Sequence, residues 1–161
     1  MNKVFVDSDV ILDLLAHRLP HFHFSALLFT FADMKKLELY TTPTVFCNVF
    51  YILRKELGIE KAKEALRKLR LIVNIIDSTE KTIDRALNSD FSDFEDAIQC
   101  YTAENHNISV ILTRNIKDYK AGNILVQSPE VFLCSIKQGD KSGLHNALTM
   151  GMVWLERANR T

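Results

Sequence analysis

The sequence has no excess of positive or of negative charge. It also has no apolar run that approaches membrane-spanning length. Its 161 residues include 20 lysines and arginines and 20 aspartates and glutamates, which gives a formal net charge of zero. No global basic field marks it as a nucleic-acid-binding protein, although a local basic patch is compatible with this balance. No signal peptide precedes the first predicted strand, so we expect a cytoplasmic protein that makes no membrane contact.

Cysteine spacings typical of a zinc site are absent too. The three cysteines, Cys47, Cys100 and Cys134, are far apart, and each is set in an apolar helical context. No CxxC or Cys/His spacing indicates a metal. The pattern predicts three buried free thiols in a reducing compartment.

Short apolar and β-branched segments alternate with helical patterns along the chain. We predict strands at residues 4–6, 37–41, 71–76, 109–112 and 124–126. We predict helices at residues 9–16, 21–36, 44–57, 60–70, 80–88, 93–106 and 128–137. This alternation is typical of a three-layer α/β/α domain around a mostly parallel sheet of four to five strands. One core suffices for residues 1–138, and residues 139–161 are a C-terminal extension for which helical and mobile states both stay open.

Polar and acidic residues follow two predicted strands at the point where each strand ends. Asp7 and Asp9 come directly after the first strand, and Thr113, Asn115 and Asp118 follow the fourth. Parallel strands end at one edge of their sheet, where open α/β folds hold their ligands. We therefore expect these side chains to meet in one cleft.

A third acidic segment opens the helix predicted at residues 93–106. Asp93 and Asp96 are three residues apart and so lie on one face of its first turn, although Asp93 also fits as an N-cap. Carboxylates gathered in one cleft repel each other unless a cation neutralises them, and hard oxygen ligands indicate Mg²⁺ or Mn²⁺. Such a site can activate water for in-line displacement at a phosphoryl group.

Plainer roles are open for several of these acids. Asp9 fits as a helix N-cap, Glu95 as a solvated residue and Asp13 as a helix-surface acid. These roles do not account for Asp7 and Asp96, because apolar residues flank each of them in the sequence. A buried carboxylate without a partner is costly, so these two acids are the first candidates for a functional site.

Four segments of the chain carry motifs in a specific order. They are VDSDVILD at residues 6–13, FEDAIQ at 94–99, LTRNIKDY at 112–119 and SPEVFL at 128–133. Together they resemble the PIN-domain family, which includes the ribonuclease toxins of VapC-type toxin–antitoxin pairs. The resemblance covers about residues 3–135. It implies a compact PIN-like α/β fold, a homodimer, a partner antitoxin, and Mg²⁺- or Mn²⁺-dependent cleavage of single-stranded RNA.

The resemblance also implies roles for the acids. Asp7 and Asp96 correspond to the first and third acids of the family's cluster and would hold the metal. Asp118 or Asp93 would complete the ligand set, and Asp9 would help from the outer shell.

Amides stand where the family usually has its second and fourth acids. Asn48 and Asn115 fall at these positions, and each keeps an oxygen ligand but carries no charge. By the resemblance they would shape the second ligand position or orient a water, and Thr113 would hydrogen-bond a ligand acid. Basic residues are expected to contact RNA phosphate, and the candidates are Arg114, Lys117, Arg54 and Lys55.

Two alternatives stay open. The two amides and the neutral charge also suit a degenerate PIN domain that binds RNA or a protein without cutting. Asp7-Ser8-Asp9 also suits a haloacid dehalogenase-like phosphatase, with a nucleophilic Asp and an acid/base Asp two residues on. That family needs a Lys and an acidic pair downstream of Thr113, whereas the pair here, Asp93 and Asp96, lies upstream.

Overall fold

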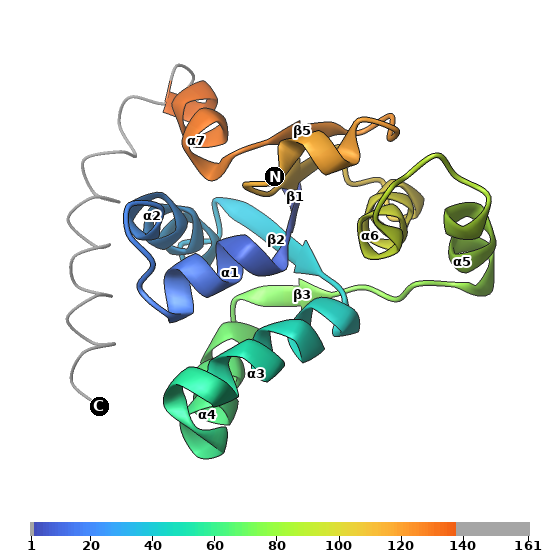
Figure 1. Cartoon of the computed structure of the whole chain (residues 1–161). Helices are drawn as coiled ribbons and strands as arrows, with labels where there is room; N and C mark the ends of the chain where they lie inside the picture. Colours follow the sequence, from blue (N-terminus) through green and yellow to red (C-terminus); the bar gives the residue numbers. More distant parts are fainter. Residues whose placement is uncertain (1, 138–161) are drawn as a thin grey trace.

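Five parallel strands form the centre of the protein, in the order β3-β2-β1-β4-β5 (Figure 1). In chain order they are β1 (Asn2–Val6), β2 (Leu37–Thr41), β3 (Val73–Ile75), β4 (Val110–Leu112) and β5 (Leu125–Gln127). Each pairing is parallel, which confirms the predicted sheet. The computed structural model describes residues 2–137, and the predicted extension at 139–161 lies outside the described residues.

Helices flank this sheet on both faces. They are α1 (Ser8–Leu15), α2 (Phe22–Asp33), α3 (Pro43–Leu57), α4 (Ile59–Arg70), α5 (Glu80–Leu87), α6 (Phe94–Asn105), α7 (Pro129–Lys137) and the 3₁₀ helix η1 (Ile116–Tyr119). Figure 1 shows α1 and α2 on one side of the sheet and α5 and α6 on the other, which confirms the three-layer α/β/α fold. Within residues 2–137, no helix has the length and hydropathy needed to span a membrane.

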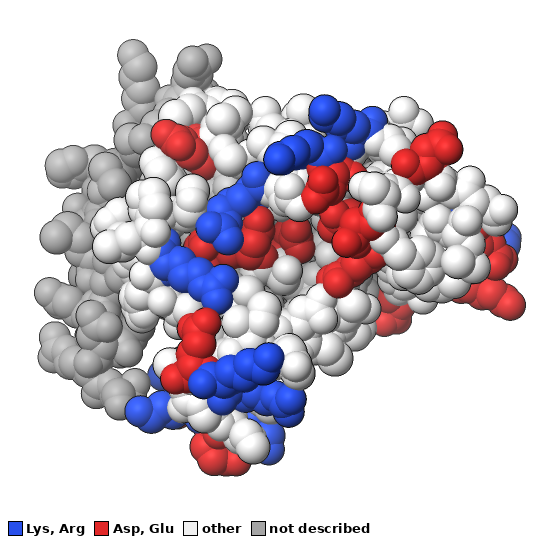
Figure 2. Space-filling model, viewed as in Figure 1, with Lys and Arg blue, Asp and Glu red and all other residues white. Residues whose placement is uncertain are grey.

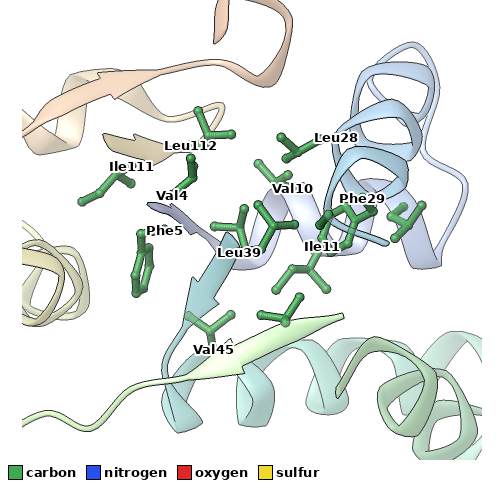
Figure 3. Close-up of a cluster of buried hydrophobic side chains, with 14 of the residues drawn as sticks. Val4, Phe5, Val10, Ile11, Leu28, Phe29, Leu39, Val45, Ile111 and Leu112 are labelled. Carbon is green, nitrogen blue, oxygen red and sulfur yellow. The ribbon is translucent and has the colours of Figure 1, made fainter. Parts of the chain in front are cut away.

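The central strand β1 is buried on both faces. Val4, Phe5 and Val6 each have 0% exposure. Successive side chains of a strand point to opposite faces, and Figure 3 shows Phe5 with Ile111 on one side and Val4 with Val10 on the other. Each fully buried apolar side chain of this kind contributes about 1.5–3 kcal/mol. The position of Asp7, directly after β1, is therefore fixed by the core.

The order of the strands reverses between β1 and β4. The chain adds β2 and β3 on one side of β1, and later β4 and β5 on the other. In open α/β sheets, ligands bind beyond the carboxyl ends of the strands at such a switch point. Asp7 follows β1 and Thr113 follows β4, so these two polar residues frame the expected binding position.

Two local predictions about helix and strand ends are wrong. Asp9 does not cap α1, because the cap is Asp7, whose side chain accepts a hydrogen bond from the backbone N–H of Ser8. The third strand is Val73–Ile75 rather than residues 71–76, since the first two residues of that range form the turn that ends α4.

The cysteines are free thiols, as predicted, but only one is buried. Cys100 is buried in the core, and burial raises the pKa of its thiol to about 12. The prediction of burial is wrong for Cys47 and Cys134, because these positions of α3 and α7 face outward.

Candidate active site at the carboxyl edge of the sheet

Asp7 and Thr113 meet across the switch point. Thr113 Oγ1 lies 3.0 Å from Asp7 Oδ2 and 3.3 Å from Asp9 Oδ2, and its single proton goes to one carboxylate at a time. Asp7 Oδ1 accepts a hydrogen bond from the backbone N–H of Ser8 at 2.5 Å. Burial raises the pKa of Asp7, and the charge of Asp9 raises it further, against the opposing hydrogen bonds. The ends of β1 and β4 are thus joined through a buried carboxylate.

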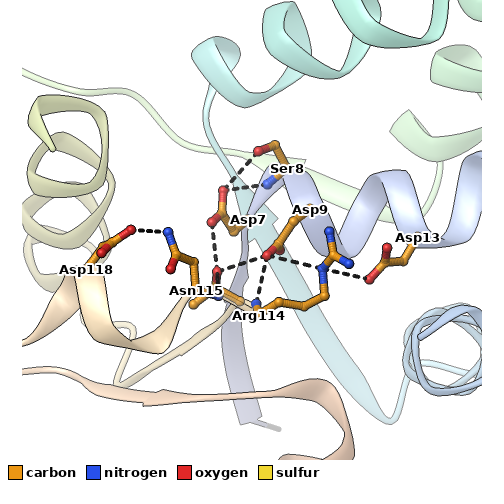
Figure 4. A network of polar contacts seen from close by, with 8 residues as sticks. Asp7, Ser8, Asp9, Asp13, Arg114, Asn115 and Asp118 are labelled. Carbon is orange, nitrogen blue, oxygen red and sulfur yellow. Dashed lines mark hydrogen bonds and ion pairs between the residues drawn. The ribbon is translucent and has the colours of Figure 1, made fainter. Parts of the chain in front are cut away.

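The guanidinium of Arg114 lies against two carboxylates of α1 (Figure 4). Its Nε is 3.6 Å from Asp9 Oδ2 and 3.4 Å from Asp13 Oδ2, and the Arg114 backbone N–H donates to Asp9 Oδ2 at 2.8 Å. Burial raises the pKa of Asp13, and the charge of Arg114 lowers it. Asp13 is 0% exposed, so its prediction as a helix-surface acid is wrong. The contact of Arg114 with RNA phosphate stays a prediction.

Asp96 approaches this cluster from the first turn of α6. Burial raises the pKa of Asp96 to about 7, and the charges of Asp7, Asp93 and Asp118 add to the effect. Asp93 is the N-cap of α6, and its Oδ1 accepts the backbone N–H of Asp96 at 3.2 Å. Carboxylates from three parts of the chain are therefore close enough for their charges to act on Asp96, and a cation would relieve that repulsion.

The segment after β4 carries Asn115 and Asp118. Asn115 Nδ2 donates to Asp118 Oδ2, and Thr113 Oγ1 accepts the backbone N–H of Asn115 at 3.0 Å. Lys117 is exposed on η1 between them. The amide thus holds the Asp118 carboxylate beside the acidic cluster.

The prediction of Glu95 as a solvated residue is wrong. Glu95 Oε1 accepts hydrogen bonds from Asn48 Nδ2 of α3 at 2.6 Å and from Gln99 Nε2 at 3.1 Å. Gln99 is 1% exposed, and its Oε1 accepts the Tyr119 hydroxyl at 3.2 Å. The same hydroxyl lowers the pKa of Asp96. Glu95 is half-buried, and its two hydrogen bonds hold its carboxylate in place. The sequence feature that indicated this role is Gln99, four residues later on the same helix face.

Arg54 and Lys55 lie in the last turn of α3. The Arg54 guanidinium is 4.7 Å and the Lys55 ammonium 4.1 Å from the centroid of the Tyr51 ring. At 1.5 Å per residue, Arg54 is about 9 Å further along the helix than Asn48. Their contact with RNA stays a prediction.

Charges of both signs share the face that carries the site. Figure 2 shows acidic side chains gathered near the middle of this face and basic side chains along an interrupted border around them. A basic border attracts a polyanion, and the acidic centre repels it until a cation neutralises the carboxylates.

The donors at the site fit a hard divalent cation. Carboxylate and amide oxygens are the ligands that Mg²⁺ and Mn²⁺ prefer. Among residues 2–137, no three His, Cys, Asp or Glu side chains converge on a single point. Mg²⁺ usually keeps several waters and binds one or two protein carboxylates together with substrate phosphate, so a pair of carboxylates such as Asp7 and Asp96 would be enough to hold it.

The fold and the site define an α/β domain with an acidic site at the switch point of a parallel sheet. A family model described as PIN domain matches residues 3–117. The chain is also 30% identical over 139 residues to ribonuclease VapC1 of Aquifex aeolicus, a match that covers 81% of this chain and 93% of that protein. The chain belongs to the PIN-domain family, of the VapC type, which confirms the resemblance and sets the phosphatase alternative aside.

Solved structures share the fold at low sequence identity. VapBC2 of Rickettsia felis, bound to a DNA fragment from its promoter, has a TM-score of 0.61 at 16% identity, covering 78% of this chain and 98% of that chain. PAE2754 of Pyrobaculum aerophilum has a TM-score of 0.61 at 16% identity over 85% and 96% of the two chains. VapC20 of Mycobacterium tuberculosis, a toxin that cleaves the sarcin-ricin loop, has a TM-score of 0.54 at 17% identity over 67% and 86%.

Proposed function

We propose that the protein is a metal-dependent endoribonuclease that hydrolyses phosphodiester bonds in single-stranded RNA. The observation that carries the proposal is the gathering of carboxylates beyond the ends of β1 and β4. Thr113 Oγ1 of the β4 end lies 3.0 Å from Asp7 Oδ2, and the charges of Asp7, Asp93 and Asp118 add to the effect of burial on the pKa of Asp96. The cofactor is Mg²⁺ or Mn²⁺. When bound, it supplies a Lewis acid that activates water and stabilises charge on the phosphoryl oxygen during in-line displacement.

The chain's own residues hold and orient this site. Asp7 and Asp96 would hold the cation directly, and Asp118 or Asp93 would support them through the charge that each adds beside Asp96. Thr113 fixes the orientation of Asp7 through the hydrogen bond of 3.0 Å. Asp9 acts from the outer shell, because its Oδ2 already accepts the backbone N–H of Arg114 and lies 3.6 Å from the Arg114 guanidinium.

The two amides hold carboxylates in place. Asn48 donates to Glu95, and Asn115 donates to Asp118. Glu95 adds a carboxylate to the α3 side of the site, where the amide at position 48 contributes no charge. Each amide therefore orients a carboxylate instead of providing one.

RNA phosphates meet the basic border. Lys117 is the nearest candidate because it precedes Asp118 on η1 and is exposed. Arg114 is partly committed to Asp9 and Asp13. Arg54 and Lys55 would contact RNA phosphates that lie further from the cleaved bond.

The solved structures of similar fold support a proposal about the partner proteins of this chain. VapBC2 of Rickettsia felis and a complex from Klebsiella pneumoniae are toxin–antitoxin assemblies. We propose that this chain is a cytoplasmic toxin that forms a homodimer and is held by an antitoxin. Co-expression with a small reading frame next to its gene, followed by size-exclusion chromatography with light scattering, tests both assemblies.

Cleavage of an RNA panel with and without Mn²⁺ tests the enzymatic proposal. The wild type should cut only with the metal, and Asp96→Asn should lose the activity while keeping the circular dichroism spectrum. Asp33→Asn, an exposed acid on α2, is the matched control and should cut like the wild type. Equal cleavage by Asp96→Asn would show that the activity arises elsewhere or from a contaminant.

A second candidate function is a domain that binds RNA or a protein without cleavage. The uncharged amides Asn48 and Asn115 are the observation that favours it. The two functions differ in metal binding, because a ligand that binds only the folded state raises the melting temperature. No thermal shift with Mg²⁺ or Mn²⁺ would favour the non-catalytic function.

A further inference from the structure

A pocket lies beside the acidic site, between the loop that joins α5 to α6 and the segment that starts with η1. Its volume is about 560 Å³, within the range of roughly 300–1,000 Å³ typical of ligand sites. Asp118 lines this pocket and is also hydrogen-bonded to Asn115. The pocket and the acidic site therefore share a wall.

One wall of the pocket is aromatic and already in place. The rings of Phe91 and Tyr101 meet edge to face, with centroids 5.7 Å apart and planes at 74°. The Arg85 guanidinium lies 3.9 Å from the Tyr101 ring centroid and pairs with Glu104 at 2.9 Å. Both rings line the pocket, and side chains that are already held in place by packing need little reorganisation when a ligand binds.

Gly122 follows Lys120 and Ala121, which line the pocket, and it packs closely against Cys100 and Phe91. A Cβ at Gly122 would lie 2.6 Å from Cys100 Sγ and 3.3 Å from Phe91 Cζ, so only glycine lets the chain after η1 approach α6 this closely. The Gly122 backbone N–H donates to the Tyr119 carbonyl at 3.0 Å. The pocket is thus built by packing on both sides.

Cations and hydrogen-bonding groups complete the lining. Lys117 and Lys120 are exposed there, and neither forms an ion pair with any residue between 2 and 137. Asn88 is fixed, since its Nδ2 donates to the Asp84 carbonyl at 2.8 Å. Asp90 adds an acceptor.

We infer that this pocket binds the base of an RNA nucleotide next to the cleaved phosphate, with Lys117 and Lys120 on the flanking phosphates. The inference rests on the proposed ribonuclease function. Proteins recognise single-stranded RNA by packing splayed bases against aromatic side chains and by hydrogen bonds to their edges. The aromatic wall, the fixed polar groups, and Lys117 and Lys120 on either side of Asp118 match that chemistry, whereas a purely electrostatic contact needs no such pocket.

Base-dependent RNA binding tests the inference. The Asp96→Asn chain is titrated by fluorescence anisotropy with short unstructured RNAs in which a single abasic nucleotide occupies each position in turn. One abasic position should weaken binding about 5- to 100-fold. That positional effect should vanish when Tyr101→Leu is added, provided that thermal melting shows a folded protein.

Exposed lysines give a second pair of variants that do not threaten folding. Lys120→Ala should weaken binding of the intact RNA severalfold, whereas Lys81→Ala, an exposed lysine of α5, should not. RNA binding that is insensitive to every abasic position would overturn the pocket while leaving the ribonuclease proposal intact. Loss of antitoxin binding in Tyr101→Leu without any change in RNA binding would also overturn it, in favour of a protein contact. Failure of the wild type to bind or cut any RNA would contradict the ribonuclease proposal itself.

Discussion

Asn48 Nδ2 of α3 lies 2.6 Å from Glu95 Oε1 of α6. A carboxylate at position 48 would face Glu95 at this distance and repel it. The amide at 48 and the acid at 95 are therefore a matched pair, and Gln99 supports the same oxygen at 3.1 Å. The negative charge that α3 lacks is present within hydrogen-bonding distance, on the neighbouring helix.

Replacing Glu95 tests this pairing. Glu95→Gln keeps the size of the side chain but removes its charge, so Mn²⁺ affinity and the cleavage rate should fall about 10- to 100-fold, as for residues that tune a metal site. Isothermal titration calorimetry and initial-rate assays measure the two effects. Glu80→Gln, an exposed acid in the first turn of α5, should change neither. Wild-type affinity in Glu95→Gln would limit Glu95 to a structural role.

Arg114 is expected to matter for stability as well as for RNA. Arg114→Ala leaves the Asp13 carboxylate buried without its cation, which should lower the free energy of unfolding by about 2 kcal/mol. Asp13→Asn combined with Arg114→Ala should recover part of the loss, measured by urea denaturation. The control is Lys68→Ala, whose ion pair with Glu64 is exposed and should contribute less than about 1 kcal/mol. Equal losses for Arg114→Ala and Lys68→Ala would contradict the pairing with Asp13.

The stability of the metal-free protein should depend on pH through Asp96. Burial and the charges of Asp7 and Asp93 raise the pKa of Asp96 from 3.8 to about 7. From about pH 4 to about pH 7 the folded protein holds a proton that the unfolded chain has released, so stability falls as pH rises through this window.

Melting temperatures in EDTA and in Mn²⁺ measure this dependence. The EDTA sample should melt at a lower temperature at pH 8 than at pH 5, and Mn²⁺ should restore stability mainly at pH 8, where the carboxylates are ionised. Asp96→Asn should make the profile in EDTA less steep, and the raised pKa values of Asp7, Asp9 and Asp13 account for the slope that remains. A wild-type profile that rises with pH across this range would contradict the raised pKa.

Thr113 should act through the position of Asp7. Thr113→Val preserves the shape but removes the hydroxyl that bonds Asp7 and accepts the Asn115 backbone N–H. We expect a loss of about 1–3 kcal/mol in unfolding free energy and a lower kcat with little change in KM, from denaturation and steady-state cleavage. Thr44→Val, an exposed position on α3, is the control. An unchanged kcat in Thr113→Val would show that Thr113 does not position Asp7 for catalysis.

Local patterns predicted the sheet and the acids, because both follow from short stretches of sequence. The apolar run before Asp7 places β1 in the core, and parallel strands bring Asp7 and Thr113 to one edge. Partners that depend on how helices dock were not predictable in this way. Asn48 and Glu95 are 47 residues apart, and helix periodicity puts Asp9 and Asp13 on one face without revealing that Arg114 covers it.

A Mn²⁺ titration by isothermal calorimetry tests most directly whether a cation is held between Asp7 and Asp96. The wild type and the exposed-acid control Asp33→Asn should bind Mn²⁺ with equal affinity, and Asp96→Asn should bind at least about tenfold more weakly. Equal affinity in all three proteins, or no binding in the wild type, would contradict a metal-dependent nuclease at this site.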